Sequence, residues 1–310
     1  MFNSQCSILN PGKLVVAALI CTLALLGQGR PDDAARELTG SIDIHVHSDP
    51  DSRARSIDAI DVAKLARSKG MRGIVLKNHD DPTGGLAYIV RKEVPGLEVY
   101  GGIALNLAVG GINPVAVQHM TEVSGGWGRI VWMPTYDAEN HIRNGNENRP
   151  FVSVSRNGEL LPDVKNVIGL IAKNGLVLAT GHSSPAEGLM LVREGHRQGV
   201  QRMVVTHAMF TPVFMNIDQM KEAAQEGAFI EFAGGSVSGA AGAARMDSFA
   251  DAIRKVGPEF CILSSDLGQR GNPLPPDGFG AFLLAMRARG FTEQEVDRMA
   301  KQNPARLLGL

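Results

Sequence analysis

The feature that most constrains the fold is a regular alternation of short apolar runs with longer helical patterns. The cores of the short runs are mostly apolar on both faces, as in Ile74–Leu76 and Val177–Ala179. Strands of that kind are typical of a parallel sheet covered by helices on its outside. The predicted strands are Gly40–His47, Gly73–Lys77, Leu97–Leu105, Arg129–Met133, Leu176–Thr180, Met203–Thr206, Phe229–Phe232 and Cys261–Ser264.

Helical patterns fill the intervals between these runs. In the first of them, Ile57–Lys69, apolar residues recur on one face, Arg67 lies in the last turn, and Gly70 is placed to end the helix. Strand–helix units in this order favour an α/β fold, a (β/α)₈ TIM barrel with a parallel eight-stranded barrel, over an open sheet. The other predicted helices are Val164–Lys173, Pro185–Gln198, Ile217–Glu226, Ser248–Lys255 and Gly278–Arg289.

Length and charge agree with one such barrel. The chain has 310 residues, of which 44% are hydrophobic, and a barrel of this class typically uses about 250 residues as a single domain. We therefore predict one barrel domain over residues 30–310. The 31 basic and 32 acidic residues nearly cancel, so the sequence indicates no basic face for nucleic acid or an anionic membrane.

The first 29 residues are predicted to be a signal peptide. Lys13 precedes an apolar run from Leu14 to Leu26, and a short stretch of glycine and glutamine follows. The run is shorter than the roughly 20 residues that a membrane-spanning helix needs. Export to the periplasm or the medium is expected; the alternatives are an uncleaved membrane anchor or a start further downstream in a cytoplasmic protein. Cys261 would be the one cysteine of the mature chain, so no internal disulfide is expected.

The candidate functional residues lie at the ends of predicted strands. The first strand ends in Asp43-Ile44-His45-Val46-His47. Alternation along a strand puts His45 and His47 on the same face, and two imidazoles at that spacing can bind one divalent cation. On its own, such a pair more often consists of ordinary strand residues.

Three further strand ends strengthen the prediction of a metal site. His182 follows the fifth strand, His207 the sixth and Asp266 the eighth. Side chains after the carboxyl ends of barrel strands meet at the face where barrel active sites form. We therefore predict that these residues share a metal ion with the first pair, whereas His119 and His196 fall in helical patterns and are expected to be surface or packing residues.

This arrangement resembles the amidohydrolase superfamily. The resemblance covers nearly the whole mature chain and includes the tail Asn303–Leu310, which is similar to the closing helix of many such enzymes. The matching motifs identify the superfamily but say little about the substrate. The matching residues are His45 and His47 after strand one, His182 after strand five, His207 after strand six and Asp266 after strand eight.

The resemblance implies a metal-dependent hydrolase with one or two divalent ions, most often Zn²⁺. His45, His47 and Asp266 would hold the more buried ion. His182 and His207 would hold a second ion or orient the substrate in a one-metal variant. Asp266, with His207 beside it, is the expected catalytic group: a metal brings the pKa of bound water from roughly 15.7 to about 7, and a neighbouring carboxylate can carry the proton to the leaving group.

One departure concerns the ligand between two metals. Two-metal members usually use a carboxylated lysine or a glutamate after strand four, and the fourth strand here is followed by neither. Lys77, at the end of strand two, is our candidate for a carboxylated bridge, because a carbamate turns a buried lysine into an anion that the metals stabilise. The alternative is an ordinary ion pair with Asp80, Asp81 or Asp266. Glu231, on strand seven, is a second candidate for the bridge.

Three other side chains are candidates for contact with the substrate. His79, at the end of strand two, is either a substrate contact or a further ligand. His141 ends the loop Tyr136–His141, which is expected to overhang the site, and either binds substrate or caps a turn. Arg55, like Arg53, follows strand one, where a guanidinium can bind a carboxylate or phosphate; the alternative is a solvated charge ahead of the next helix.

The expected function is hydrolysis of an amide, cyclic amide, ester or lactone bond in a small-molecule substrate. Phosphoester hydrolysis and decarboxylation at the same metal centre are alternatives, as is an exported metal-binding barrel without turnover. Deamination of the zinc cytidine-deaminase kind is disfavoured, because its H-x-E and paired-cysteine pattern is absent from the sequence. Specificity is expected to lie in the loops Thr135–Leu161 and Leu267–Asp277.

Overall fold

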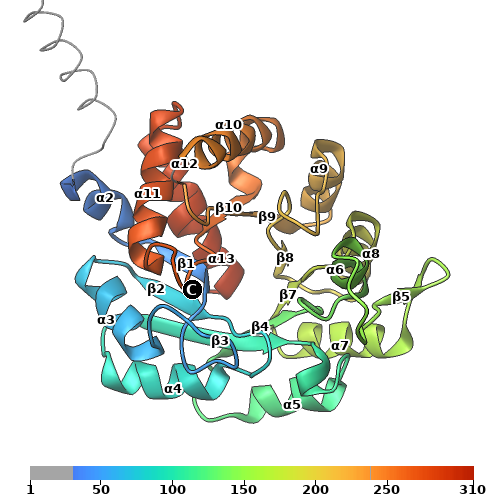
Figure 1. Ribbon diagram of the computed structural model, residues 1–310. Coiled ribbons are helices and arrows are strands. Elements are labelled where there is room, and N and C mark those ends of the chain that lie inside the picture. Colours follow the sequence, from blue (N-terminus) through green and yellow to red (C-terminus); the bar gives the residue numbers. More distant parts are fainter. Residues whose placement is uncertain (1–30, 238) are drawn as a thin grey trace, which may run out of the picture.

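A computed structural model of the protein describes residues 31–310 except residue 238. Its main sheet contains eight parallel strands in the order β1-β2-β3-β4-β7-β8-β9-β10, with helices around it (Figure 1). Each of the eight predicted strands corresponds to one of these. The strands are β1 (Ile42–Val46), β2 (Gly73–Leu76), β3 (Glu98–Ala104), β4 (Gly128–Trp132), β7 (Val177–Ala179), β8 (Met203–Val205), β9 (Ala228–Ala233) and β10 (Cys261–Ser264).

The sheet closes between β10 and β1. Leu267, just beyond β10, pairs with Val46 in a parallel bridge. The amide of His47 donates to the carbonyl of Leu267 at 2.9 Å, and the amide of Asp266 donates to the carbonyl of His45 at 3.0 Å. The predicted (β/α)₈ barrel is therefore confirmed, and its seam joins the two strand ends that carry the candidate ligands.

One long helix follows each barrel strand, as the parallel topology requires. A short helix, α2 (Pro31–Leu38), precedes β1 and packs against the helix that follows β10. The chain ends with α12 (Glu293–Asp297), η3 (Arg298–Gln302) and α13 (Asn303–Leu308). The helices that follow the strands are α3 (Ala59–Ser68), α4 (Gly84–Glu93), α5 (Pro114–Glu122), α7 (Pro162–Lys173), α8 (Pro185–Arg197), α9 (Ile217–Gln225), α10 (Gly239–Val256) and α11 (Pro275–Ala288).

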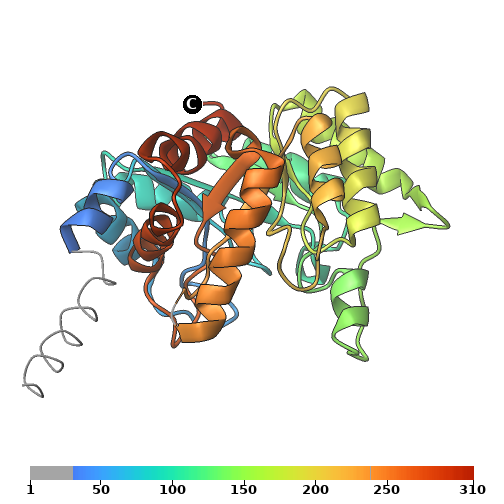
Figure 2. The same ribbon diagram turned by 90° about the horizontal axis from the view of Figure 1, so that it is seen from above.

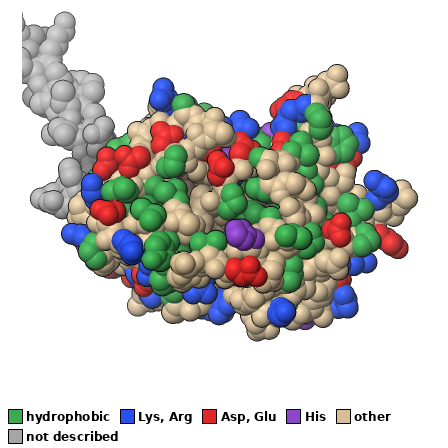
Figure 3. Space-filling view, turned by 90° about the horizontal axis from the view of Figure 1, so that it is seen from below, with side chains coloured by type: hydrophobic (Ala, Val, Ile, Leu, Met, Phe, Trp, Pro, Cys, Tyr) green, Lys and Arg blue, Asp and Glu red, His purple; other side chains and the backbone are tan. Residues whose placement is uncertain are grey.

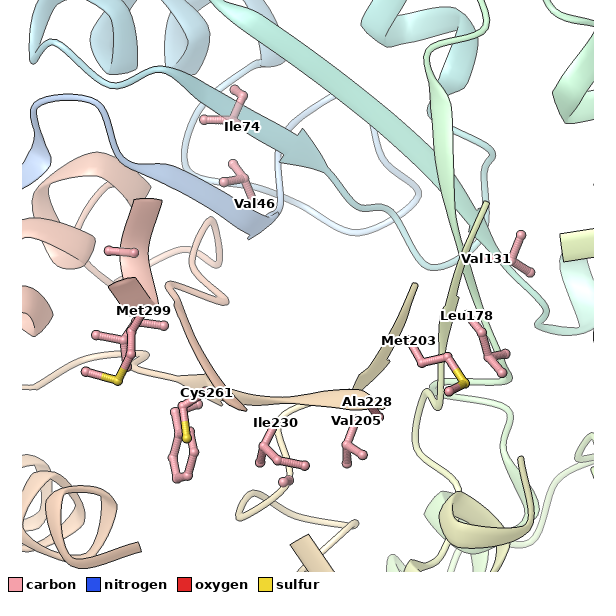
Figure 4. Packing of buried hydrophobic residues seen from close by; sticks show 14 of the residues in the cluster. Val46, Ile74, Val131, Leu178, Met203, Val205, Ala228, Ile230, Cys261 and Met299 are labelled. Atoms are coloured by element: carbon pink, nitrogen blue, oxygen red, sulfur yellow. The ribbon is translucent and has the colours of Figure 1, made fainter. Parts of the chain in front are cut away.

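Alternation along the strands divides the core into two layers. Residues such as Val205, Ile230 and Cys261 point outward from the sheet toward the helices (Figure 4). Their neighbours Val204 and Ile262 belong to a second buried cluster that fills the barrel. The outer layer holds the helices on the sheet, and the inner layer makes the barrel a packed body.

Helix α13 closes the amino-terminal end of the barrel. Its Ala305, Leu307 and Leu308 join the interior cluster, where they pack with Ile42 and Ile44 from β1. Figure 2 shows α13 at one end of the barrel and the short helix α6 (Glu139–Asn144) at the other. This leaves the carboxyl ends of the strands as the open, polar end.

The long connection between β4 and α7 lies over that open end. It contains α6 and a small antiparallel hairpin of β5 (Ser155–Arg156) and β6 (Glu159–Leu160). A parallel bridge between Ala138 and Val152 ties the connection to itself. The loop Thr135–Leu161 thus contains a short helix and a hairpin, and it carries His141 toward the strand ends.

Acidic and basic side chains are interspersed on the face shown in Figure 3, where neither sign gathers into a continuous patch. No helix in the described part of the chain is long and apolar enough to cross a membrane. The predicted signal peptide at residues 1–29, on which the expected export depends, lies outside the described residues.

Candidate metal centre

A bulge in β1 turns His45 into the barrel. The pairing of β1 with β2 shifts register between Asp43 and Val46. Ile42 and Ile44 both pack in the interior cluster, so strict alternation would turn His45 outward. A bulge adds one residue to a strand and re-aims the side chains beyond it. As a result, the rings of His45 and His47 both reach the mouth, with centroids 5.2 Å apart.

Asp266 joins these two rings. Its Oδ1 lies 3.1 Å from His45 Nε2 and 3.1 Å from His47 Nε2. Ligand atoms of the three side chains all lie within 4.8 Å of one another. Burial raises the pKa of Asp266, but the charge and hydrogen bonds of His45 and His47 outweigh it and hold the pKa well below its ordinary value. The result is an ionised carboxylate between two imidazole nitrogens.

Glu231 holds His45 from the opposite side of its ring. Its Oε1 lies 3.0 Å from His45 Nδ1 and accepts from the Ser264 hydroxyl at 2.7 Å, and its Oε2 accepts from the His207 amide at 2.8 Å. Burial raises the pKa of Glu231, but the charge of His45 prevails and lowers it to about 2. An ionised carboxylate only accepts, so Nδ1 carries a proton and donates to Glu231, and Nε2 is the nitrogen that would bind a metal once the metal displaces its own proton. Glu231 thus lies where it orients a ligand, which differs from the bridging position proposed for it from the sequence.

Lys77 lies at the centre of the cluster. Its side chain is 1% exposed and its Nζ is 2.9 Å from His45 Nε2. Among the described residues it forms no ion pair with a carboxylate within 4.0 Å, so the ordinary ion pair with Asp80, Asp81 or Asp266 is not found. Burial lowers the pKa of Lys77 to about 8. Burial and Lys77 also lower the pKa of His45, but the carboxylates of Asp266 and Glu231 raise it to about 9.

His182 and His207 extend the cluster across the mouth. The ring centroids of His182 and His207 are 4.8 Å apart, and that of His207 is 6.0 Å from His45. Both rings are buried, and burial lowers the pKa of His207 to about 4 and that of His182 well below its ordinary value. Neutral imidazoles are the form that binds metals. The Nδ1 atom of His207 is buried without a hydrogen-bond partner among the described residues.

An aromatic group lies beside these ligands. The His79 ring stacks on His47 at 4.9 Å and lies 4.0 Å from the ring of Tyr136. His141, from α6, places its Nδ1 3.0 Å from Nδ1 of His182. Both histidines predicted to contact substrate therefore lie at the site. Tyr136 was named from the sequence only as part of an overhanging loop, because a lone tyrosine in a loop carries no signal of its own.

The two arginines after β1 differ in their surroundings. Arg55 is 5% exposed, and its Nε donates to Asp51 Oδ2 at 2.7 Å, so it is buried instead of solvated. Arg53 is 47% exposed, lies 3.7 Å from Asp80 Oδ2, and stacks over Tyr136 at 4.2 Å. The Arg55 charge is near enough to lower the pKa of Lys77 and of His79. Both guanidinium groups thus lie near the mouth, held by carboxylates.

Two other predicted residues lie away from the site. His119 is exposed on α5 and His196 is exposed on α8. His196 forms an ion pair with Glu226 at 3.1 Å. Their surface positions agree with what their helical patterns predicted.

A family model described as "Family of unknown function (DUF6282)" matches residues 40–231. That is more than half of the chain. The chain belongs to DUF6282. The matched region of this DUF6282 protein includes His45, His47, Lys77 and His207, and it ends at Glu231, so that Asp266 lies beyond it. No curated protein matches the sequence.

Solved structures share the barrel. An amidohydrolase from Pseudomonas aeruginosa aligns with a TM-score of 0.60 and 12% identity, over 89% of this chain and 97% of that one. A mutant of an organophosphorus hydrolase from Deinococcus radiodurans aligns with a TM-score of 0.56 and 18% identity, over 89% of this chain and 94% of that one. A 2,6-dihydroxybenzoate decarboxylase complexed with 2,6-dihydroxybenzoate aligns with a TM-score of 0.57 and 13% identity, over 88% of this chain and 100% of that one. The predicted likeness to the amidohydrolase superfamily is confirmed, and at these identities it is a likeness of fold.

Proposed function

We propose that this DUF6282 protein is an enzyme, a metal-dependent hydrolase that cleaves an amide, cyclic amide, ester or lactone bond with a metal-activated water. The observation that carries the proposal is the convergence of His45, His47 and Asp266, whose ligand atoms lie within 4.8 Å of one another at the open end of the barrel. Groups at that end of a barrel come from several strands and are typically catalytic.

The side chains present fit a divalent cation. Two imidazole nitrogens and one carboxylate oxygen form a common ligand set of catalytic zinc sites, and Glu231 holds Nδ1 of His45, so that Nε2 is the nitrogen that faces Asp266. We propose His45, His47 and Asp266 as ligands of a first Zn²⁺. His182, His207 and a carboxylated Lys77 would hold a second. An ion held there would supply Lewis acidity and lower the pKa of bound water to about 7.

The residues of the chain then have separate tasks. The Asp266 side chain is 27% exposed, so it borders the open mouth. It would accept the proton of the attacking water and pass it to the leaving group. His207 would act beside it, as a ligand or in orienting the substrate. Lys77, His45 and Glu231 are at most 2% exposed, so bulk water does not reach these three side chains of the site.

We also propose where the substrate enters. It is a small molecule that reaches the mouth between the loops Thr135–Leu161 and Leu267–Asp277. Arg55 and Arg53 are placed to bind an anionic group on it, because their guanidinium groups lie close to the ligand cluster. Export through the predicted signal peptide would put the reaction outside the cytoplasm.

Elemental analysis and a substrate panel test the proposal. The panel contains esters, lactones, cyclic amides and N-acyl amino acids, with a phosphotriester, a phosphomonoester and an ortho-hydroxybenzoate for the alternative reactions. We expect at least one equivalent of metal and turnover of an acyl substrate. Asp266→Asn should keep most of the metal and lose nearly all turnover, whereas Asp251→Asn, at a carboxylate that is 63% exposed, should change neither.

Other results would redirect the proposal. If the protein binds metal but turns over none of these compounds, it is a metal-binding barrel without catalytic activity. Turnover of only the phosphate esters or only the hydroxybenzoate would favour the corresponding alternative. Protein that holds no stoichiometric metal after loading with zinc, manganese or iron would overturn the metal centre itself.

A further inference from the structure

We infer that His79 donates a hydrogen bond from its Nε2–H to the carbonyl oxygen of the substrate, and that Thr135 and Asn106 fix the tautomer that makes this possible. The inference rests on the proposed function for its substrate, and on hydrogen bonds of the protein alone for the tautomer. His79 follows β2, Asn106 follows β3 and Thr135 follows β4. All three are buried.

The orientation of Asn106 is set by backbone groups that can only donate. Its Oδ1 accepts from the amide of Thr135 at 2.8 Å and from the amide of Asp137 at 3.2 Å. The other side-chain atom is therefore the NH₂ group. It donates to the carbonyl of His79 at 2.7 Å and to Thr135 Oγ1 at 2.7 Å. Both hydrogens of the amide are used, so Asn106 has one orientation.

The hydroxyl of Thr135 connects the oriented amide of Asn106 to the ring of His79. Thr135 Oγ1 accepts from Asn106 and lies 2.8 Å from His79 Nδ1. It has no other hydrogen-bond partner in residues 31–237 and 239–310, so the hydroxyl hydrogen is directed to His79 Nδ1. Nδ1 is then an acceptor. In a neutral imidazole the proton must reside on the other nitrogen, Nε2.

The position of the ring gives this Nε2–H group its role. The His79 ring stacks 4.9 Å from His47 and lies 6.2 Å from His182, so it borders the ligand cluster. Its Nε2 has no hydrogen-bond partner among the described residues. A protonated nitrogen has no lone pair for a metal. His79 therefore differs from the neighbouring histidines: beside a bound metal ion it would be a hydrogen-bond donor instead of a ligand.

A neutral imidazole donor suits acyl transfer. Negative charge develops on the carbonyl oxygen when water adds to the carbonyl carbon, and a preorganised N–H stabilises that charge. Removal of one such donor typically lowers kcat about 10²- to 10³-fold. The proton stays on Nε2 throughout, so His79 is distinct from Asp266, which moves a proton.

The tautomer is tested by ¹⁵N NMR of protein labelled at histidine, with His79→Gln used to assign the resonances. We expect His79 to show a pyrrole-type Nε2 and a pyridine-type Nδ1. Thr135→Ser keeps the hydroxyl and should keep this spectrum. Thr135→Val keeps the shape without the hydroxyl and should give a mixture of tautomers. A wild-type His79 protonated on Nδ1 would overturn the inference.

Loading with ¹¹³Cd tests the role of His79 separately from the existence of the proposed metal centre. Scalar coupling to cadmium should appear on nitrogens of His45 and His47 and should be missing from His79. Coupling to His79 would make it a ligand and overturn the inference, while the metal centre would stand. If no histidine couples and no cadmium binds, the proposed function fails, and the tautomer is still decided by the metal-free spectrum.

Donation to a carbonyl is tested with acetohydroxamate, a small metal-binding probe that carries one. We expect its Kd for the zinc-loaded protein to weaken about tenfold in His79→Ala, the size of one net hydrogen bond. His79→Gln, whose amide N–H can reach the place of Nε2, should recover part of the loss. An equal Kd for wild type and His79→Ala, at equal zinc content, would refute the donor role.

Discussion

Glu231 Oε1 and His45 Nδ1 are 3.0 Å apart, although 186 positions separate the two residues in the chain. The pair links β9 to β1 inside the barrel. Because the carboxylate can only accept, the bond determines which nitrogen of His45 faces Asp266. The ligand supplied by the first strand therefore depends on a side chain from the seventh barrel strand.

We predict that Glu231→Gln weakens zinc binding about 10- to 100-fold, the usual effect of removing a carboxylate that supports a ligating histidine. The amide has the same shape, so the fold should persist. Competition with a chromophoric chelator measures the affinity. Glu93→Gln makes the same change at an exposed position on α4 and serves as the control. Equal affinities in the two variants would contradict an orienting role for Glu231.

Lys77→Ala should lower the metal content from two equivalents to one or fewer, because the alanine protein has no nitrogen on which a carbamate can form. Inductively coupled plasma mass spectrometry of protein purified in bicarbonate gives the count. Acetate should restore part of it by supplying a carboxylate in the space left by Lys77. Lys221→Ala, at an exposed site on α9, should bind as the wild type does. An unchanged metal content in Lys77→Ala would show that Lys77 does not bridge two metals.

Gly268→Ala should destabilise the barrel seam. Gly268 has φ +126°, and a Cβ there would collide with the backbone carbonyl of His47. Gly271 in the same loop also has a positive φ, +87°, but a Cβ there meets nothing within 4 Å. Gly271→Ala therefore carries only the backbone strain of about 1 kcal/mol. Urea unfolding should show a distinctly larger loss for Gly268→Ala, with weaker zinc binding; similar losses would mean that the seam tolerates the side chain.

Leu307→Ala should lower the free energy of unfolding by about 2–5 kcal/mol, because it opens a cavity beneath the barrel. The Leu307 side chain is fully buried in the interior cluster. Leu310→Ala, three residues further on and 40% exposed, should change stability by about 0.5 kcal/mol or less. Chemical denaturation of both variants measures the difference. Equal values would show that α13 is not part of the cooperative core.

Cys261 should resist alkylation in the folded protein. It is buried in β10, and burial raises the pKa of its thiol far above the ordinary range, while only the thiolate reacts. Iodoacetamide labelling followed by peptide mapping should find Cys261 unmodified in buffer and modified in denaturant. Fast labelling of the native protein would show that β10 opens locally.

Much of the fold could be predicted from the sequence, because strands buried on both faces are apolar throughout. Val177–Ala179 and Cys261–Ser264 were recognised on that basis and form β7 and β10. Helices α4 and α5 were not among the predicted helices. The first residues of α4, Gly84 and Gly85, disfavour a helix. Packing accounts for the glycine at position 84: a Cβ there would lie 3.3 Å from the backbone of Gly128 in β4.

The site was predictable only in part. Positions after strand ends are shared by every barrel of this type, which is why His45 and Asp266 could be expected to meet. The bulge that turns His45 inward has no sequence signal. The same holds for Thr135 and Asn106, which carry no metal-binding chemistry, and whose effect on His79 depends on three loops placed side by side.

Two of the candidate functional residues have backbones that side chains rarely adopt. His207 has φ 27° and Asp266 has φ 50°, and such conformations cost of order 1–3 kcal/mol each in a residue other than glycine. Selection for a durable barrel alone would favour glycine at both places. A lineage that stopped needing the chemistry would therefore be expected to lose these two side chains early and become harder to unfold as it did so.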